Sequence, residues 1–254
     1  MNPTCVFGLR AIAGLAVVLA AVVMHSPASA QTDASACGPL AAAGGYGPYD
    51  YRTDRDKLSI VEGPHFPPSV EALIKGKSGT IGAELSYTLR AFPNHHRALN
   101  AVMRYGEKLK TPQPRDLEYP VECYFERALR FRPDDTVARM LYAQFLGRNK
   151  RATEALGQLA ITAEKAGDNA FTHYNIGMLY VDLKEYDKAL ARAHEAYRLG
   201  FLRPELRERL AIAGKWTDPM AEPKSAEPAP ASSAPAAPSA PETGGAPEPG
   251  KTPG

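Results

Sequence analysis

The sequence predicts an all-α protein, namely a short solenoid of about three helix-turn-helix units with a closing helix and an irregular N-terminal cap segment. The main observation is a 34-residue period of small and aromatic residues across positions 136–203. In the later unit these positions hold Ile176, Gly177, Tyr180, Tyr186, Ala189, Ala193 and Ala196. Residues of similar size precede most of them by 34 positions, at Tyr142, Ala143, Leu146, Ala152, Ala155, Leu159 and Thr162. Such a period is typical of stacked helical hairpins.

Residues 1–30 have the pattern of a secretory signal peptide. One early positive charge, Arg10, precedes an apolar stretch over residues 11–24, and Ala28-Ser29-Ala30 resembles an A-x-A cleavage site. The apolar stretch is too short to favour a membrane span, so we expect cleavage after Ala30 and a periplasmic or secreted mature chain. An uncleaved N-terminal anchor is the alternative.

The mature chain would then contain two cysteines, Cys37 and Cys123. In an oxidising compartment two cysteines are more often paired than free, so we expect a disulfide. Closing a loop of about 86 residues would stabilise the fold by roughly 4 kcal/mol in the chain-entropy model. Two unrelated buried thiols are one alternative. Lipid attachment at Cys37 is another, which its distance from the apolar stretch disfavours.

Residues 31–93 form the expected N-terminal cap segment. Residues 44–51 are rich in glycine and aromatic residues and indicate a loop, and residues 58–61 suggest a short strand or extended segment. Two prolines at 67 and 68 indicate the first turn of a helix that Gly76 ends. We expect this segment to pack on the helical array, attached through its cysteine.

Residues 94–135 are expected to form a divergent first repeat. Asn94 is a candidate N-cap for a helix that continues to about Tyr105, and a second helix is expected over 119–131 after a long turn. Their inward positions are Leu99, Val102, Met103, Phe125 and Ala128. Pro133-Asp134-Asp135 should end the second helix and cap the next.

The second and third repeats are expected at 136–169 and 170–203. Their four helices should lie near 136–147, 151–166, 170–183 and 186–199. A closing helix within 204–216, with Leu206 and Leu210 facing inward, would cover the apolar end of the array. Residues 217–254 are rich in proline and alanine and have no aromatic residue. They cannot bury enough apolar area to fold, so we expect a disordered tail.

In the three expected repeats the chain resembles tetratricopeptide-repeat proteins, most closely in the third repeat. The stretches around Cys123-Tyr124-Phe125 and Phe92-Pro93-Asn94 are similar to those of exported proteobacterial members of this family. The second repeat departs from the family pattern where Gly167 replaces the usual proline. The resemblance implies a right-handed helical array whose concave face binds a peptide or protein, without catalysis or a cofactor.

The resemblance also implies which residues contact a partner, because in this family the first helix of each unit lines the groove. Carried over to this chain, that face holds Arg97, Ala101, Arg104, Met140, Gln144, Phe171, Tyr174, Asn175 and Met178. Arginines suit a partner's carboxylates, and methionine and aromatic side chains suit its apolar residues. The alternative is that some of these side chains pack against the N-terminal segment or the closing helix.

Other classes of function receive little support. The formal net charge of +2 predicts no general attraction to nucleic acid. The chain has no haem-attachment, zinc-hydrolase or phosphate-loop motif, so we expect no enzyme and no metal. A metal site built from His65 and His95 stays open, and a structural subunit of a cell-envelope assembly is the other alternative.

Overall fold

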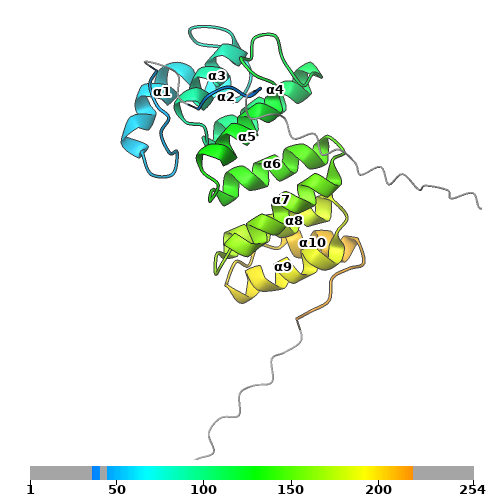
Figure 1. Ribbon diagram of the computed structural model, residues 1–254. Helices are drawn as coiled ribbons and strands as arrows, with labels where there is room; N and C mark the ends of the chain where they lie inside the picture. The colour runs from blue at the N-terminus through cyan, green and yellow to red at the C-terminus, as the bar shows by residue number, and fades with distance from the viewer. Residues whose placement is uncertain (1–35, 41–44, 220–254) are drawn as a thin grey trace, which may run out of the picture.

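The computed structural model describes residues 36–40 and 45–219, and within these ranges the regular secondary structure is entirely helical (Figure 1). The elements are η1 (Arg55–Lys57), α1 (Leu58–His65), α2 (Pro68–Glu71), α3 (Ile81–Ala91), α4 (His96–Leu109), α5 (Val121–Phe131), α6 (Thr136–Arg148), α7 (Ala152–Lys165), α8 (Ala170–Asp182), α9 (Tyr186–Arg198) and α10 (Glu205–Ile212). None of these helices has the length and apolar character needed to cross a membrane. The expected signal peptide and all but the first residues of the expected tail lie outside the described ranges.

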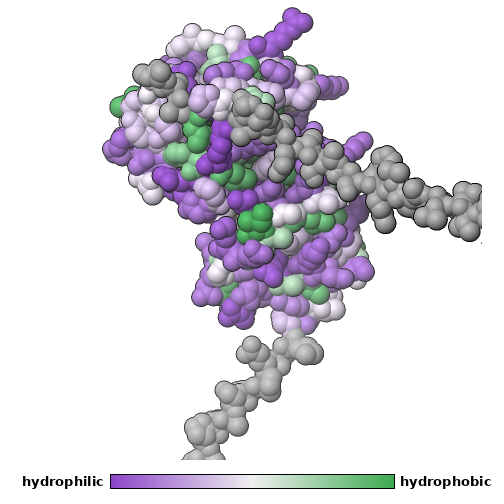
Figure 2. Space-filling model, in the orientation of Figure 1, coloured by the Kyte–Doolittle hydropathy of each residue, from purple (hydrophilic) through white to green (hydrophobic). Residues whose placement is uncertain are grey.

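The helices are stacked in chain order, from α1–α3 at one end to α9 and α10 at the other (Figure 1). Contacts join α4 to α6 and α6 to α8, so these three helices form one continuous row. The helices α5, α7 and α9 each pack beside a member of this row. On the face shown in Figure 2 the surface is mostly hydrophilic, and hydrophobic residues gather in small patches near the middle. An all-helical fold is therefore confirmed for the described residues.

The three helices of this row, α4, α6 and α8, share one kind of N-terminus. In each case the N-cap side chain accepts a hydrogen bond from the backbone N–H three residues later, at 2.9–3.1 Å. The three pairs are His95 with Ala98, Asp135 with Ala138, and Asn169 with Thr172. The sequence analysis was therefore one residue wrong about the first cap: Asn94 is buried and donates instead to Asp50 and Asp135.

From residue 136 onward the helices lie within about two residues of their expected ends. Alanines on α9 are fully buried against α8, which allows the two helices to pack closely. Leu206 and Leu210 of α10 are also fully buried, and α10 contacts both α8 and α9. The closing helix therefore covers this end of the stack, as expected.

The segment before α4 is more helical than the sequence indicated. Residues 58–61 belong to α1, where a strand or extended segment was expected, and α2 ends at Glu71 rather than Gly76. The helix α3 was missed altogether. Its Leu85 and Leu89 point into the same core cluster as residues of α4 and α5. Much of this segment is therefore an integral part of the helical core.

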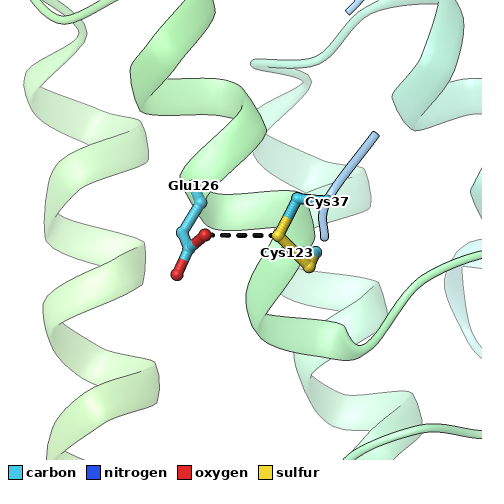
Figure 3. A group of neighbouring side chains, drawn as sticks. All are labelled: Cys37, Cys123 and Glu126. Atoms are coloured by element: carbon cyan, nitrogen blue, oxygen red, sulfur yellow. Dashed lines mark hydrogen bonds between the residues drawn. A yellow bond between two sulfur atoms is a disulfide. The ribbon is translucent and has the colours of Figure 1, made fainter. Parts of the chain in front are cut away.

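A disulfide between Cys37 and Cys123 attaches the N-terminal end of the described chain to α5 (Figure 3). The guanidinium of Arg127 reinforces it by donating to the carbonyl oxygens of Cys37 and Pro39 at 2.8 and 2.7 Å. A carboxylate oxygen of Glu126 lies 3.2 Å from Sγ of Cys37. The expected pairing of the two cysteines is present in the structure.

Candidate functional site

The row of α4, α6 and α8 presents equivalent positions separated by 40 and 34 residues. Arg97, Val137 and Phe171 are one such set, and Arg104, Gln144 and Met178 are another, seven residues further along each helix. Positions seven apart lie on the same face of a helix. Two open depressions follow this face, one over α6 and α8 and one over α4 and α6.

The depression over α6 and α8 has a volume of about 310 Å³ and is mainly apolar. Its lining residues are Val137, Met140, Leu141, Gln144, Phe171, Tyr174, Asn175, Met178, Leu179 and Asp182. Six of the predicted groove residues therefore come together here. Phe171 is 51% exposed, and its ring lies edge-on to that of Phe201 with ring centres 5.9 Å apart.

Tyr174 lies in the floor of this depression and has a structural role. Its ring is 6% exposed and packs against Phe201 with ring centres 4.9 Å apart. Its hydroxyl donates to a carboxylate oxygen of Glu205 at 3.0 Å, which ties α8 to α10. Burial, together with this hydrogen bond, raises the pKa of Tyr174 to about 12. The alternative that some predicted groove residues pack against the closing helix is correct for this side chain.

The depression over α4 and α6 is larger, about 550 Å³, and basic. It is lined by His96, Arg97, Asn100, Arg104, Val137, Leu141, Gln144 and Arg148. Val137, Leu141 and Gln144 line both depressions, so the two adjoin along α6, and together they are called the groove. All the lining residues come from α4, α6 and α8, so the described part of the N-terminal segment does not fill the groove.

The arginines of the basic part differ in their partners. Arg97 forms a bidentate pair with Glu71 on α2 and lies 3.4 Å from Glu62 on α1, so it also anchors the N-terminal helices. Its pKa is raised chiefly by the hydrogen bond to Glu71. Arg148 pairs with Glu107 at 3.0 Å. Within the described ranges, Arg104 has no hydrogen bond or ion pair.

Ala101 does not line the groove, although the resemblance placed it there. It is 1% exposed and belongs to the main core cluster. The sequence analysis also missed several lining residues: His96, Asn100, Val137, Leu141 and Arg148. The 40- and 34-residue offsets would have found most of them, because they repeat the same helix faces.

Two other clusters could suggest chemistry, but their side chains already have partners. Glu84 accepts from His65, and Glu62 accepts from His95, so the histidines left open for a metal contact different carboxylates. Cys37, Cys123 and Glu126 lie close enough together to resemble a metal site. Both sulfur atoms belong to the disulfide, however, and neither is a thiolate (Figure 3).

A buried polar cluster joins the N-terminal loop to the start of α4 and the α5–α6 turn. The carboxylate of Asp50 accepts hydrogen bonds from Arg52 and Asn94, and Asn94 also donates to Asp135. Burial raises the pKa of Asp50, but these hydrogen bonds outweigh burial and hold it well below the usual range. His96 adds a further hydrogen bond to Asp135 at 2.9 Å. The cluster holds three segments together.

No protein-family model matches the chain, and no curated protein matches it. Because neither comparison suggests a function, the function has to be inferred from the geometry. The groove over α4, α6 and α8 is the feature of the described chain that best supports one.

Proposed function

We propose that this protein is an exported helical-repeat module of the tetratricopeptide type that holds an extended segment of a partner protein or peptide. The partner would lie in the groove over α4, α6 and α8. The observation that carries the proposal is the groove itself, with Phe171 half exposed at one end and Arg104 without a partner among the described residues at the other. Exposed apolar surface next to polar groups is typical of a binding site.

The composition of the groove favours binding over catalysis. Its side chains are mainly arginine, amide, methionine and aromatic groups, which contact a ligand without transferring protons or electron pairs. The histidine in the lining, His96, is hydrogen-bonded to Asp135 and thereby takes part in the buried polar cluster. An interaction module accounts for all of these residues.

Export is part of the same proposal. The disulfide between Cys37 and Cys123 suits an oxidising compartment such as the periplasm. The residues expected to form the signal peptide lie outside the described ranges, so the sequence pattern alone supports that step.

Site-specific photo-crosslinking in the cells that make the protein tests the proposal. A photoreactive phenylalanine derivative at position 171 should form adducts with a partner, because that side chain is exposed in the groove. The same probe at Ile161, which is 36% exposed on α7 outside the groove lining, is the matched control. Tyr174 is unsuitable, since its replacement would disturb the packing of α10.

Adducts at position 171 that disappear in an Arg104→Glu background would support a binding groove. Adducts at position 161 without any at 171 would contradict the proposal and favour a structural subunit of an assembly, contacted through its outer helices.

A further inference from the structure

We infer that the partner is an extended acidic segment with one large apolar side chain about six or seven residues away from its carboxylates. The inference rests on the proposed function and adds the chemistry of the ligand. It is argued from the charge, apolar surface and length of the groove.

The groove is electrostatically asymmetric. Three arginines line the part over α4 and α6, and none of the residues that line this part is a carboxylate. The carboxylates that pair with two of these arginines, Glu71 and Glu107, lie outside the lining. Arg104 is exposed and makes no ion pair within the described ranges, and Glu71, whose pKa it helps to lower, is already paired with Arg97. A guanidinium in this position suits bidentate contact with a ligand carboxylate.

The other part of the groove is suited to an apolar side chain. Phe171 and Met178 rise from α8, and Leu141 faces them from α6, whereas Met140 is only 6% exposed and belongs to a core cluster. Its one acidic lining residue, Asp182, is already paired with Arg209 at 2.6 Å. Flexible methionines beside an aromatic ring can adapt to several apolar side chains, so this part would select for size rather than for one residue type.

The spacing of the ligand groups follows from helix packing. Packed helix axes lie about 8–10 Å apart, so two successive contacts put α4 and α8 roughly 16–20 Å apart. Arg104 also lies seven residues, or about 10 Å, further along its helix than Phe171 does along α8, so the two side chains are roughly 19–23 Å apart. An extended chain advances about 3.3 Å per residue, so roughly six or seven residues cover this distance. A ligand whose acidic residue lies over Arg104 would thus place its apolar residue near Phe171 if that number of residues separates the two. The ligand chain could run in either direction.

The chain's own C-terminal segment fits this description poorly. Met220 is the only large apolar residue of the sequence from 220 to 254 and directly follows the last described residue, so the chain beyond it could bring glutamates but no large apolar side chain to the groove. We therefore assign the groove to a separate partner.

Selection from a displayed library of random 16-residue peptides tests the inference with the whole mature protein. Peptides enriched on the wild type should carry Asp or Glu about six or seven positions from Phe, Leu, Ile or Met. Synthetic versions, measured by fluorescence anisotropy, should bind at least tenfold more weakly to Arg104→Glu and to Phe171→Ser. Arg115→Glu removes an exposed arginine outside the groove, and its affinity should stay within twofold of the wild type.

The possible outcomes separate the two proposals. Peptides that lose affinity for both groove variants, yet show no acidic residues at this spacing, would overturn the inference and leave the binding groove in place. Enriched peptides that bind both groove variants as well as the wild type would overturn the inference and the proposed function together.

Discussion

Lowering the pH should destabilise this protein through His95, the N-cap of α4. The ring is fully buried, with the ring of Tyr51 centred 4.1 Å away. Its Nδ1 accepts the N–H of Ala98 at 3.1 Å, so the proton is on Nε2, which donates to Glu62 at 2.9 Å. A second proton would turn Nδ1 into a donor and break the helix cap. Burial lowers the pKa of His95 to about 3, and the positive charge of Arg97 acts in the same direction.

The size of the effect follows from proton linkage. An unfolded histidine has a pKa of about 6.5, so between pH 6.5 and 3 the unfolded chain binds a proton that the folded chain does not. The free energy of unfolding therefore falls as the pH falls through this window. At about 1.4 kcal/mol per pH unit, the loss from His95 between pH 7 and pH 4.5 is on the order of 2–3 kcal/mol. The pKa values of buried carboxylates such as Asp50 and Asp135 are lowered in the folded chain. Their protonation therefore reduces the free energy of unfolding mainly below about pH 4.

Urea unfolding of the wild type and His95→Asn at pH 7 and pH 4.5 measures this difference. Asparagine keeps a side-chain oxygen for the cap but does not titrate. The wild type should lose roughly 2–3 kcal/mol more than the variant on acidification, whatever their stabilities at pH 7. Equal losses in the two proteins would refute the assignment of this pH dependence to His95.

Four further changes should be measurable. In urea unfolding, Cys123→Ser removes the bridge to Cys37 and should lower the free energy of unfolding by up to about 4.5 kcal/mol; a loss below about 1 kcal/mol would contradict the role given to this bridge. Leu206→Ala should lower it by about 2–5 kcal/mol, because this side chain of α10 is fully buried against α8. Asp135→Ala should lower it by at least about 2 kcal/mol through loss of the α6 cap and of its buried partners, and a neutral result would show that the polar cluster is dispensable. In contrast, Phe171→Ser should change the melting temperature by no more than a few degrees, since the ring is half exposed.

The helices after residue 94 could be predicted because their signals are local. The period of small residues places α6 to α9, and Asp135 and Asn169 are ordinary N-caps at the starts of α6 and α8. The closing helix follows from Leu206 and Leu210, four residues apart on one face.

The helix α3 was missed because it corresponds to α5 at an offset of 40 residues, not 34. Phe92 at its end and Arg132 at the end of α5 have nearly the same backbone angles, with φ −132° and −134° and ψ 84° and 85°. They are 40 residues apart, whereas the sequence was compared at 34. A polar, glycine-containing stretch over 75–80 also precedes α3 and hides its start. A search at both periods would have found it.

The candidate site could be predicted in outline but not in detail. Helix periodicity selects the face of α8 that holds both Phe171 and Tyr174, yet it cannot tell the exposed ring from the buried one. The burial of Tyr174 depends on Phe201 and Glu205, which lie some 30 residues further along the chain. In the same way, Ala101 is buried by contacts in the core cluster that no local pattern reveals.

The most direct test of the binding groove is methyl NMR of the mature protein labelled at its methionines. Met140 and Met178 line the groove, whereas Met103 is 1% exposed in the core and serves as an internal control. Titration with a peptide selected on the wild type should shift the methyl signals of Met140 and Met178 and leave that of Met103 nearly unchanged. Saturable binding that leaves both groove methyls unmoved would contradict the placement of the partner over α4, α6 and α8.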